Sequence, residues 1–238
     1  MSSLKILVYG QTTSRVAKLL WSLGELKAPF ERDERSLLLL KQDAAYMAIQ
    51  PKGTVPTLVV ESGAGAQFVV NESNSGVAYL ASKLGAGTFY PSTPEEVAKA
   101  WEWLEWGETS VAASLSPVWF GLVKRGGYPP GSPLVKEVGE DGVAVVVNGK
   151  SVSRTLGIWH TLERHLAADK RKFIMGEHLT MADITAGVHA NRLFHLPFDE
   201  IGADMRTTLP FTRDYYQRLC ERASYQEFVV PYGKGPAK

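Results

Sequence analysis

The sequence predicts a mixed α/β domain followed by an all-helical domain. Strand and helix patterns alternate over the first third of the chain in the order β-α-β-α-β-β-α, and helical patterns dominate from Thr93 onward. Between them lies "GAGTFYPSTPEE", whose Gly, Pro, Ser and Thr content is typical of a linker. We therefore expect an N-terminal domain over residues 1–84, a linker over 85–94 and a helical domain over 95–238.

Each element of the first domain has its own pattern. "LKILVYG" predicts a strand, and "SRVAKLLWSLGEL" predicts a helix whose apolar face carries Val16, Leu19, Leu20 and Leu23. "KAPFERDER" indicates a short edge strand, and "LLLLKQDAAYMAI" a weaker helix. The apolar runs "TVPTLVV" and "AQFVV", joined by the glycine-containing "ESGAGA", indicate a hairpin. "ESNSGVAYLASKLG" then predicts the closing helix, with Gly85 as its stop.

Two capping boxes mark helix starts in the second domain. Thr93 stands three residues before Glu96, so each side chain can accept from the other residue's backbone N–H. Thr180 and Asp183 have the same spacing in "HLTMADIT". Both boxes specify where helices begin and carry no chemistry of their own.

A turn-rich segment over residues 126–150 is inserted in the helical domain. Its second half, "VAVVVNGKSVS", places Asn148 and Gly149 between strand-like flanks, which is a common hairpin signal. Its first half is rich in turn residues and contains no such pattern. The residues leave a small hairpin and a mobile loop as equal alternatives.

Composition excludes several classes of function. The 26 basic residues balance 25 acidic ones, so no global field recruits nucleic acid or an anionic membrane, and we expect neither partner. No apolar run is long enough to cross a bilayer, and we expect a cytoplasmic protein without a signal peptide. Cys220 is the only cysteine, which rules out disulfides within the chain and cysteine-based zinc sites. The histidine spacings also lack the pattern of a metal pair, and we expect no metal.

A proline stands at the mouth of a strand-like run in "GTVPTLVV". Proline cannot donate a ladder hydrogen bond, so Pro56 conflicts with an ordinary central strand. An X-Pro bond adopts the cis form at a cost of only about 0.5–1 kcal/mol. A cis Val55–Pro56 bond would keep the strand and turn the backbone groups of Val55 out of the sheet. A trans proline as the first residue of the strand is the alternative.

The order of elements and three motifs resemble the glutathione S-transferase family over essentially the whole chain. The motifs are "PKGTVPTLV", "NESNSGVAYL" and "FIMGEHLTMADI", the last of which contains the second capping box. The resemblance implies a thioredoxin-like N-terminal domain, an all-helical C-terminal domain and glutathione as co-substrate. It also implies a homodimer, on which the residues themselves are silent.

The resemblance implies a set of glutathione-binding residues. The segment Thr54, Val55 and Pro56 would present the Val55 backbone to the cysteinyl part of the tripeptide. Glu72 and Ser73 would hold the γ-glutamyl end, and the residue types suit this role, because a hydroxyl at a helix start binds a carboxylate and a carboxylate binds an ammonium. Alternatively, the pair merely caps the helix. Lys41 matches the position that binds the glycyl carboxylate, with nearby Lys52 as the alternative.

Conjugation requires glutathione to be ionised at its thiol. A free thiol has a pKa of about 8.5, and lowering it by ~2 units makes the thiolate the major form. The start of the helix near Arg15 supplies a positive dipole end, and a hydroxyl can donate to the sulfur. The family's spacing assigns that hydroxyl to Thr13, with Thr12 and Ser14 as close alternatives, although Thr13 also suits a helix N-cap.

The second substrate is expected to be a small hydrophobic electrophile bound between the domains. Trp106, Trp119 and Phe120 are the aromatic candidates for this site, although aromatic residues at helical spacing more often belong to the core. Two other functions stay open: a glutathione-dependent peroxidase or disulfide reductase using the same hydroxyl, and a non-catalytic interaction module with this fold.

Two residues depart from the family's pattern near the expected pocket. Gln50 replaces an asparagine before the Pro-x-Gly turn, and Gly76 replaces a larger apolar residue in the helix after Glu-Ser. A glycine inside a helix costs roughly 1 kcal/mol relative to alanine. Both departures are expected to loosen the glutathione pocket.

Overall fold

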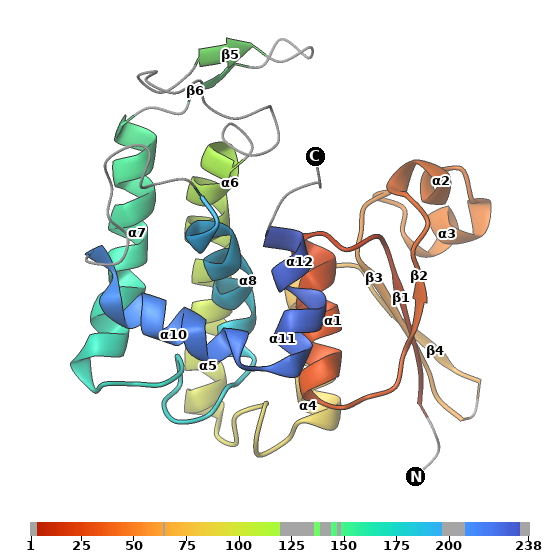
Figure 1. Cartoon of the computed structure of the whole chain (residues 1–238). Helices are drawn as coiled ribbons and strands as arrows, with labels where there is room; N and C mark the ends of the chain where they lie inside the picture. Colours follow the sequence, from red (N-terminus) through yellow and green to blue (C-terminus); the bar gives the residue numbers. More distant parts are fainter. Residues whose placement is uncertain are drawn as a thin grey trace.

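The computed structural model describes residues 4–63, 65–119, 136–138, 144–146, 149–196 and 208–233. The N-terminal part holds a four-stranded sheet in the order β2-β1-β3-β4, and the remainder is largely helical (Figure 1). The arrangement is the thioredoxin-like plus all-helical architecture that the sequence predicts. The strands are β1 (Lys5–Tyr9), β2 (Glu31–Asp33), β3 (Thr57–Glu61) and β4 (Gln67–Val70).

The sheet is mixed, because one pair of neighbouring strands is parallel and the other two pairs are antiparallel. β1 pairs in parallel with β2, with Leu7 opposite Glu31, and the helix α1 (Ser14–Glu25) makes the crossover between them. β3 is antiparallel to both β1 and β4. The predicted edge strand and hairpin are therefore present.

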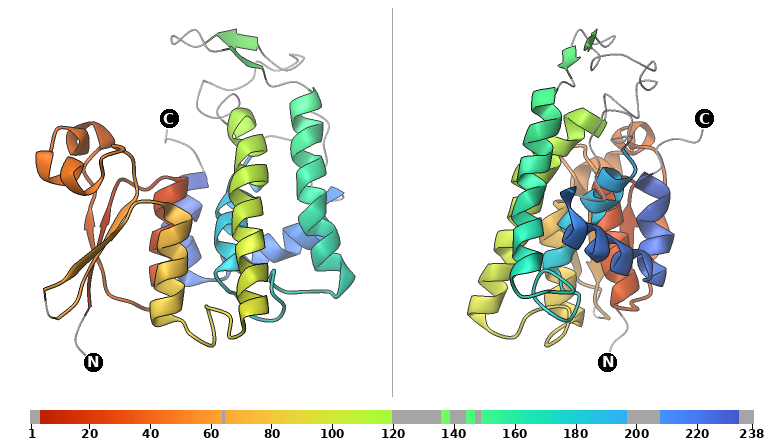
Figure 2. Two further views of the ribbon diagram at one scale, coloured as in Figure 1. Left: turned by 180° about the vertical axis from the view of Figure 1, so that it is seen from behind. Right: turned by 60° about the vertical axis from the view of Figure 1, so that its left-hand side comes forward.

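Helices cover the side of the sheet that faces the second domain. α1 and α4 (Ser73–Leu84) lie between the sheet and the helical domain, whereas α2 (Leu37–Lys41) and α3 (Ala44–Ile49) lie at one end of the sheet (Figure 2). Gly76 allows α4 to approach α1, because a Cβ there would lie only 2.7 Å from Leu19 Cδ2. Gly76 therefore permits close packing of the two helices. The expectation that this glycine loosens the pocket did not take that packing into account.

The helical domain is built around one buried helix. A long helix runs through α5 (Pro94–Trp106), the π-helical η1 (Gly107–Ala112) and α6 (Ala113–Trp119), and α7 (Gly149–Ala168) runs beside it (Figure 1). α8 (Ala182–Phe194) is buried over nearly its whole length. The C-terminal elements are α10 (Pro210–Cys220), α11 (Ala223–Phe228) and α12 (Val230–Gly233).

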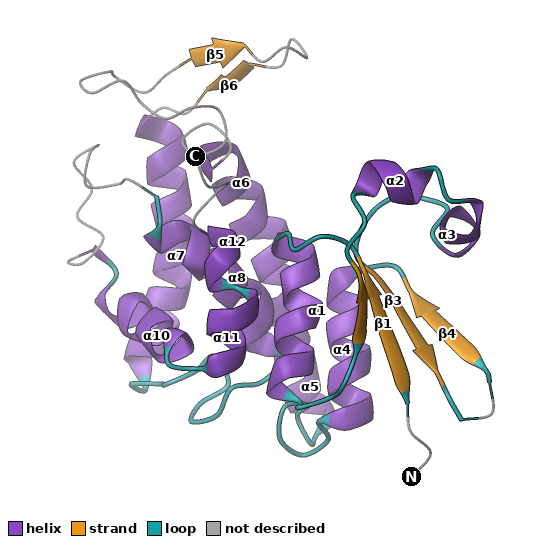
Figure 3. Cartoon of the chain, turned by 45° about the vertical axis from the view of Figure 1, so that its right-hand side comes forward, coloured by secondary structure: helices purple, strands orange, loops and turns teal. Residues whose placement is uncertain are grey.

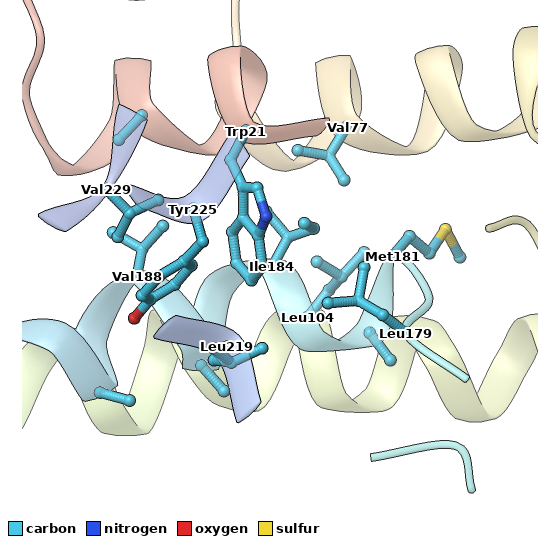
Figure 4. Packing of buried hydrophobic residues seen from close by; sticks show 14 of the residues in the cluster. Trp21, Val77, Leu104, Leu179, Met181, Ile184, Val188, Leu219, Tyr225 and Val229 are labelled. Atoms are coloured by element: carbon cyan, nitrogen blue, oxygen red, sulfur yellow. The ribbon is translucent and has the colours of Figure 1, made fainter. Parts of the chain in front are cut away.

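The core is continuous across both domains. All residues of α1 from 16 to 23 are buried, so this helix contacts neighbours on every side. Trp21 packs edge-on against Tyr225 at 4.8 Å between ring centroids, near Ile184 and Leu104 (Figure 4). α8 approaches α1 closely at Gly187, where a Cβ would lie 2.6 Å from the Trp21 ring.

The capping boxes differ in how far they form. Thr93 and Glu96 make both reciprocal hydrogen bonds, which confirms the first box. In the second, Asp183 accepts from the Thr180 N–H at 2.9 Å as predicted, but the Thr180 hydroxyl accepts from the Ala182 N–H. Asp183 also accepts from the Ile174 N–H at 2.9 Å. Burial raises the pKa of Asp183 to about 6, against the opposite effect of these N–H donors.

A two-stranded antiparallel sheet occupies part of the inserted segment. Its strands are β5 (Lys136–Val138) and β6 (Ala144–Val146), with Lys136 opposite Val146. The predicted hairpin turn at Asn148 and Gly149 is wrong. The two paired strands are connected by residues 139–143, and Gly149 begins α7. Asn148 itself lies outside the described residues.

Candidate functional site

A cavity of about 440 Å³ lies between the two domains, and both contribute to its walls. α1 and α4 begin at the same end of the sheet, beside the turn that precedes β3, and α5 continues into η1 opposite them (Figure 3). The residues that line the cavity include Arg15, Lys52, Val55, Ser73, Asn74 and Glu108. The cavity is therefore a product of the way the domains pack.

The turn before β3 presents an unpaired stretch of backbone to this cavity. The Val55–Pro56 bond is cis, as the sequence predicts, and both residues line the cavity. Among the described residues, neither backbone group of Val55 has a hydrogen-bond partner. The preceding residue is held in place, because the Tyr46 hydroxyl donates to the Thr54 carbonyl at 2.5 Å. The edge next to Pro56 is thus available to an extended ligand.

Gln50 holds this turn in place through hydrogen bonds of its side chain. Its buried amide donates to the Thr57 hydroxyl at 3.3 Å and to the Asn71 carbonyl at 3.5 Å. Asn71 in turn donates to the Ile49 carbonyl at 2.7 Å. The longer amide therefore ties the turn to the segment that enters α4, whereas the sequence suggested a looser pocket.

The start of α4 faces the cavity without a side-chain cap. Glu72 occupies the N-cap position, but its side chain makes no capping hydrogen bond and is 65% exposed. The first-turn N–H groups of a helix have no intrahelical partners, and Ser73 adds a hydroxyl beside them. This geometry disfavours the alternative that Glu72 merely caps the helix. It creates an anion-binding helix end next to a carboxylate.

Lys52, not Lys41, reaches this region. The Lys52 ammonium lies 2.5 Å from a carboxylate oxygen of Glu72 and lines the cavity. Lys41 ends α2 and packs beside Gly53, outside the cavity lining. The structure therefore brings together Glu72, Ser73 and Lys52, the residue named as the alternative.

Two of the candidate hydroxyl residues, Thr12 and Thr13, stand just before α1, and Ser14 is its first residue. Thr13 is the N-cap, and its hydroxyl accepts from the Val16 N–H at 3.5 Å. The Thr12 hydroxyl accepts from the Arg32 guanidinium at 2.9 Å. Neither threonine belongs to the lining of the cavity, and the side chain of Ser14 lies outside the described part of the structure. The capping role of Thr13 is thus present in the structure, and its catalytic role stays a prediction.

The aromatic candidates do not converge on this cavity. Trp106 is half-buried on α5, edge-on to Trp103 at 5.1 Å. Trp119 is only 2% exposed, and the Arg192 guanidinium lies 4.4 Å from its ring centroid. Phe120 lies outside the described residues. The geometry therefore favours a core role for Trp119 and leaves Trp106 as the more accessible of the two.

A partly buried polar cluster at the cavity joins the two domains. The Lys18 side chain, on α1, is 0% exposed, and its ammonium lies 2.5 Å from Glu108 of η1 and donates to Asn74 of α4 at 3.0 Å. Thr185 of α8 also donates to the Asn74 amide oxygen at 3.0 Å. The Arg15 guanidinium approaches Glu108 at 3.3 Å from the solvent side. We call Lys18, Asn74, Glu108 and Thr185 the junction cluster.

Charges within the junction cluster depend on one another. Burial lowers the pKa of Lys18, and the Glu108 carboxylate opposes that shift. Burial raises the pKa of Glu108, but Lys18 and Arg15 outweigh it, so the net pKa of this carboxyl is lowered. The pair is therefore stabilised as an ion pair in the interface.

Sequence reasoning missed the junction cluster. Lys18 and Glu108 are separated by 90 residues, and no local pattern connects them. The signal that was present is weak: a single lysine within the otherwise apolar run "VAKLLW". A charge in a helix buried on all sides requires a partner, although the sequence does not say which residue supplies it.

The described residues contain neither a group of metal ligands nor a membrane-spanning helix. Within those ranges, no three or more His, Cys, Asp and Glu side chains are grouped so that they could hold a metal ion. No helix in the described ranges has the length and apolar character needed to cross a membrane.

The structure is that of a two-domain protein in which a thioredoxin-like domain and a helical domain both line one cavity. The model of the glutathione S-transferase N-terminal domain matches residues 14–83. The glutathione S-transferase GstB of Escherichia coli is 26% identical over 227 residues, covering 94% of this chain and 98% of the relative. Residues 14–83 thus match a glutathione S-transferase N-terminal domain, and the chain as a whole is similar to transferase enzymes of that family.

Solved structures agree with this assignment. A theta-class glutathione S-transferase from Xanthomonas axonopodis pv. citri, solved with glutathione bound, is 26% identical and has a TM-score of 0.70 over 97% of this chain and 98% of its own. The silkworm transferase BmGSTD1 of Bombyx mori has a TM-score of 0.73 at 19% identity, covering 98% and 97% of the two chains, and supports the fold.

We predict that the two partners of the buried ion pair respond unequally to mutation. Glu108→Gln leaves the Lys18 ammonium buried without a countercharge and should lower the free energy of unfolding by about 3 kcal/mol, whereas Lys18→Met removes the buried charge and should cost less. Because burial lowers the pKa of Lys18 further once Glu108 is lost, the deficit of Glu108→Gln should be smaller at about pH 9 than at about pH 6. Urea denaturation at both pH values measures this.

The matched control is Glu102→Gln, which breaks the exposed pair of Glu102 with Lys99 and should change stability by less than about 0.5 kcal/mol. Equal effects of Glu108→Gln and Glu102→Gln would contradict the assignment of a buried, structurally required pair.

Proposed function

We propose that the protein is a glutathione transferase that ionises the thiol of glutathione and directs the sulfur to a small hydrophobic electrophile. The observation that carries this proposal is the uncapped start of α4, where Ser73 and Glu72 open onto the same cavity as the unpaired backbone of Val55. Glutathione bound to the theta-class relative from Xanthomonas supports it. A non-catalytic module would have no use for such a cavity.

The γ-glutamyl end of glutathione would bind at the start of α4. Its α-carboxylate would accept from the Ser73 hydroxyl and the first-turn N–H groups, and its ammonium would bind Glu72. In the structure the Lys52 ammonium forms an ion pair with the Glu72 carboxylate, so the ligand's ammonium would have to displace Lys52 from Glu72. The Lys52 ammonium is then available to the glycyl carboxylate, the role first assigned to Lys41.

The cysteinyl part would lie along the turn before β3. Its backbone would pair with the N–H and C=O of Val55, with Thr54 and Pro56 flanking the contact. In this pose the thiol would point toward the start of α1. The positive end of that helix and the charge of Arg15 both favour the thiolate.

A hydroxyl before α1 would donate to the sulfur. Thr13 can do so while it caps the helix, because a hydroxyl has one donor and two acceptor lone pairs, and Val16 uses only an acceptor position. The same reasoning applies to Thr12, which accepts from Arg32. We assign the role to Thr13, with Thr12 and Ser14 as the alternatives.

The proposed assembly is a homodimer in the cytoplasm. An apolar surface supports association: Phe68 on β4 is 49% exposed and packs against Tyr79 of α4 at 4.7 Å between ring centroids. Exposed aromatic side chains of this kind are enriched at protein interfaces.

The first test is glutathione binding by isothermal titration calorimetry, followed by conjugation of an activated aryl halide. The wild-type chain should bind glutathione and catalyse conjugation. Ser73→Ala should raise the Kd about tenfold, because it removes a hydrogen bond to a charged group. Ser62→Ala is the control, since Ser62 lies in the β3–β4 connection, away from the cavity, and should leave the Kd unchanged. A folded wild-type chain that binds no glutathione would refute the proposed function.

Thr13→Ala tests the thiol chemistry. It should raise the thiol pKa of bound glutathione by roughly 1 unit and lower the conjugation rate at neutral pH about tenfold, because the thiolate loses a hydrogen-bond donor. Thr13→Ser keeps the hydroxyl and should behave like the wild type. The ultraviolet absorbance of the thiolate, titrated against pH, reports the pKa directly. If Thr13→Ala conjugates at the wild-type rate, the role passes to Thr12 or Ser14, which Thr12→Ala and Ser14→Ala then separate.

A further inference from the structure

The junction cluster contains a pocket-lining amide whose orientation is fixed from the second domain. The Asn74 side chain has an oxygen with two lone pairs and a nitrogen with two N–H donors. Lys18 and Thr185 each donate to the oxygen at 3.0 Å, so both acceptor positions are in use. Among the described residues the nitrogen donates once, to the Leu104 carbonyl at 3.2 Å. One N–H of Asn74 is left for another acceptor.

The partners of Asn74 also exclude the flipped amide. In the reverse orientation the amide nitrogen would face the Lys18 ammonium, and two donors would oppose each other. The oxygen would likewise face the Leu104 carbonyl, which is an acceptor. The three partners therefore determine which end of the amide can serve a ligand, and that end is a donor.

The elements around Asn74 are held at close range. Leu104 lies in the last turn of α5, immediately before the π-helical η1, and helices with such turns often change register at functional sites. Gly107 lets α8 approach there, because a Cβ would lie 2.6 Å from Thr185 Cγ2. The hydroxyl of Thr185 is thus brought to Asn74 by the packing of α8 against η1.

We propose that Lys18 and Thr185 are positioning residues for glutathione, which orient Asn74 so that its remaining N–H donates to the α-carboxylate of the γ-glutamyl group. Asn74 lines the cavity directly after Ser73, on the first turn of α4, where that carboxylate is placed. The inference rests on the proposed function and adds a ligand-contacting residue to it. It also makes affinity for glutathione depend on the helical domain.

The test uses an isosteric change outside the cavity. Thr185→Val removes one hydrogen bond to the Asn74 oxygen and should raise the Kd of glutathione about fivefold, the factor that corresponds to one ordinary hydrogen bond. Thr185→Ser restores the hydroxyl and should bind like the wild type. Thr212→Val is the matched control, because Thr212 is also fully buried in the helical domain but donates to Glu163 instead. It should lower the melting temperature and leave the Kd unchanged.

A ligand analogue separates positioning from a general loss of structure. In γ-aminobutyryl-cysteinyl-glycine the glutamyl α-carboxylate is absent, while the ammonium and the thiol remain. Thr185→Val should bind this analogue as tightly as the wild-type chain does, because the contact that the variant weakens is no longer made. Equal losses of affinity for glutathione and for the analogue would overturn the proposal, as would an unchanged Kd for glutathione.

Asn74→Asp is the second variant, and it does not depend on the folding of Thr185→Val. It replaces the donor by an anion, keeps the shape and preserves a partner for Lys18. Its Kd for glutathione should rise more than about tenfold because two carboxylates would then face each other, whereas its Kd for the analogue should not rise. Binding of both ligands at wild-type affinity would overturn the proposal. A wild-type chain that binds no glutathione would refute the proposed function, and this inference with it.

Discussion

The structure depends on the burial of α1 over residues 16–23. This helix lies between the sheet of the first domain and the helices of the second, so the face that would be solvated in an isolated domain is covered by α8 and α11. Trp21 and Leu20 are apolar, so they fit this buried position by packing against their neighbours. Lys18 cannot, because a buried ammonium requires an opposite charge and hydrogen-bond acceptors. Glu108 and Asn74 supply them, and the pocket takes its shape from that requirement.

Domain packing and ligand binding are thus linked through a few polar side chains. Two carboxylates at the cavity are paired with ammonium groups, since Lys52 faces Glu72 and Lys18 faces Glu108. The two pairs differ in burial, because both side chains of the first are exposed whereas Lys18 is fully enclosed. An exposed pair contributes little to stability and exchanges partners readily, whereas a buried pair is costly to break. We therefore assign ligand exchange to the first pair and architecture to the second.

Much of the fold could be predicted from local patterns. The order of strands and helices and the Thr93 capping box follow from residues close together in the chain, whereas the local residues left the cis Val55–Pro56 bond as one of two alternatives. The hairpin turn at Asn148 and Gly149 was wrong because a turn-favouring dipeptide does not determine where a strand ends, and Gly149 begins a helix instead.

The candidate site was predicted less completely, because its polar contacts are long-range. Nothing near Lys18 in the sequence identifies Glu108 as its partner, and nothing near Asn74 identifies Thr185, which is 111 residues away. The role of Gly76 was missed for the same reason. Its missing side chain makes room for Leu19 of the neighbouring helix, and that contact is visible only once the helices are packed. Glu72 and Ser73 were expected from the family resemblance, and both line the cavity.

The most direct test of the account is a crystal structure of the protein with glutathione. We predict a tripeptide in the cavity between the domains, with its γ-glutamyl carboxylate at Ser73 and Asn74, its cysteinyl backbone paired with Val55, and Lys52 displaced from Glu72. Glutathione bound elsewhere, or a cavity that stays empty at saturating glutathione with the pair of Lys52 and Glu72 intact, would contradict it.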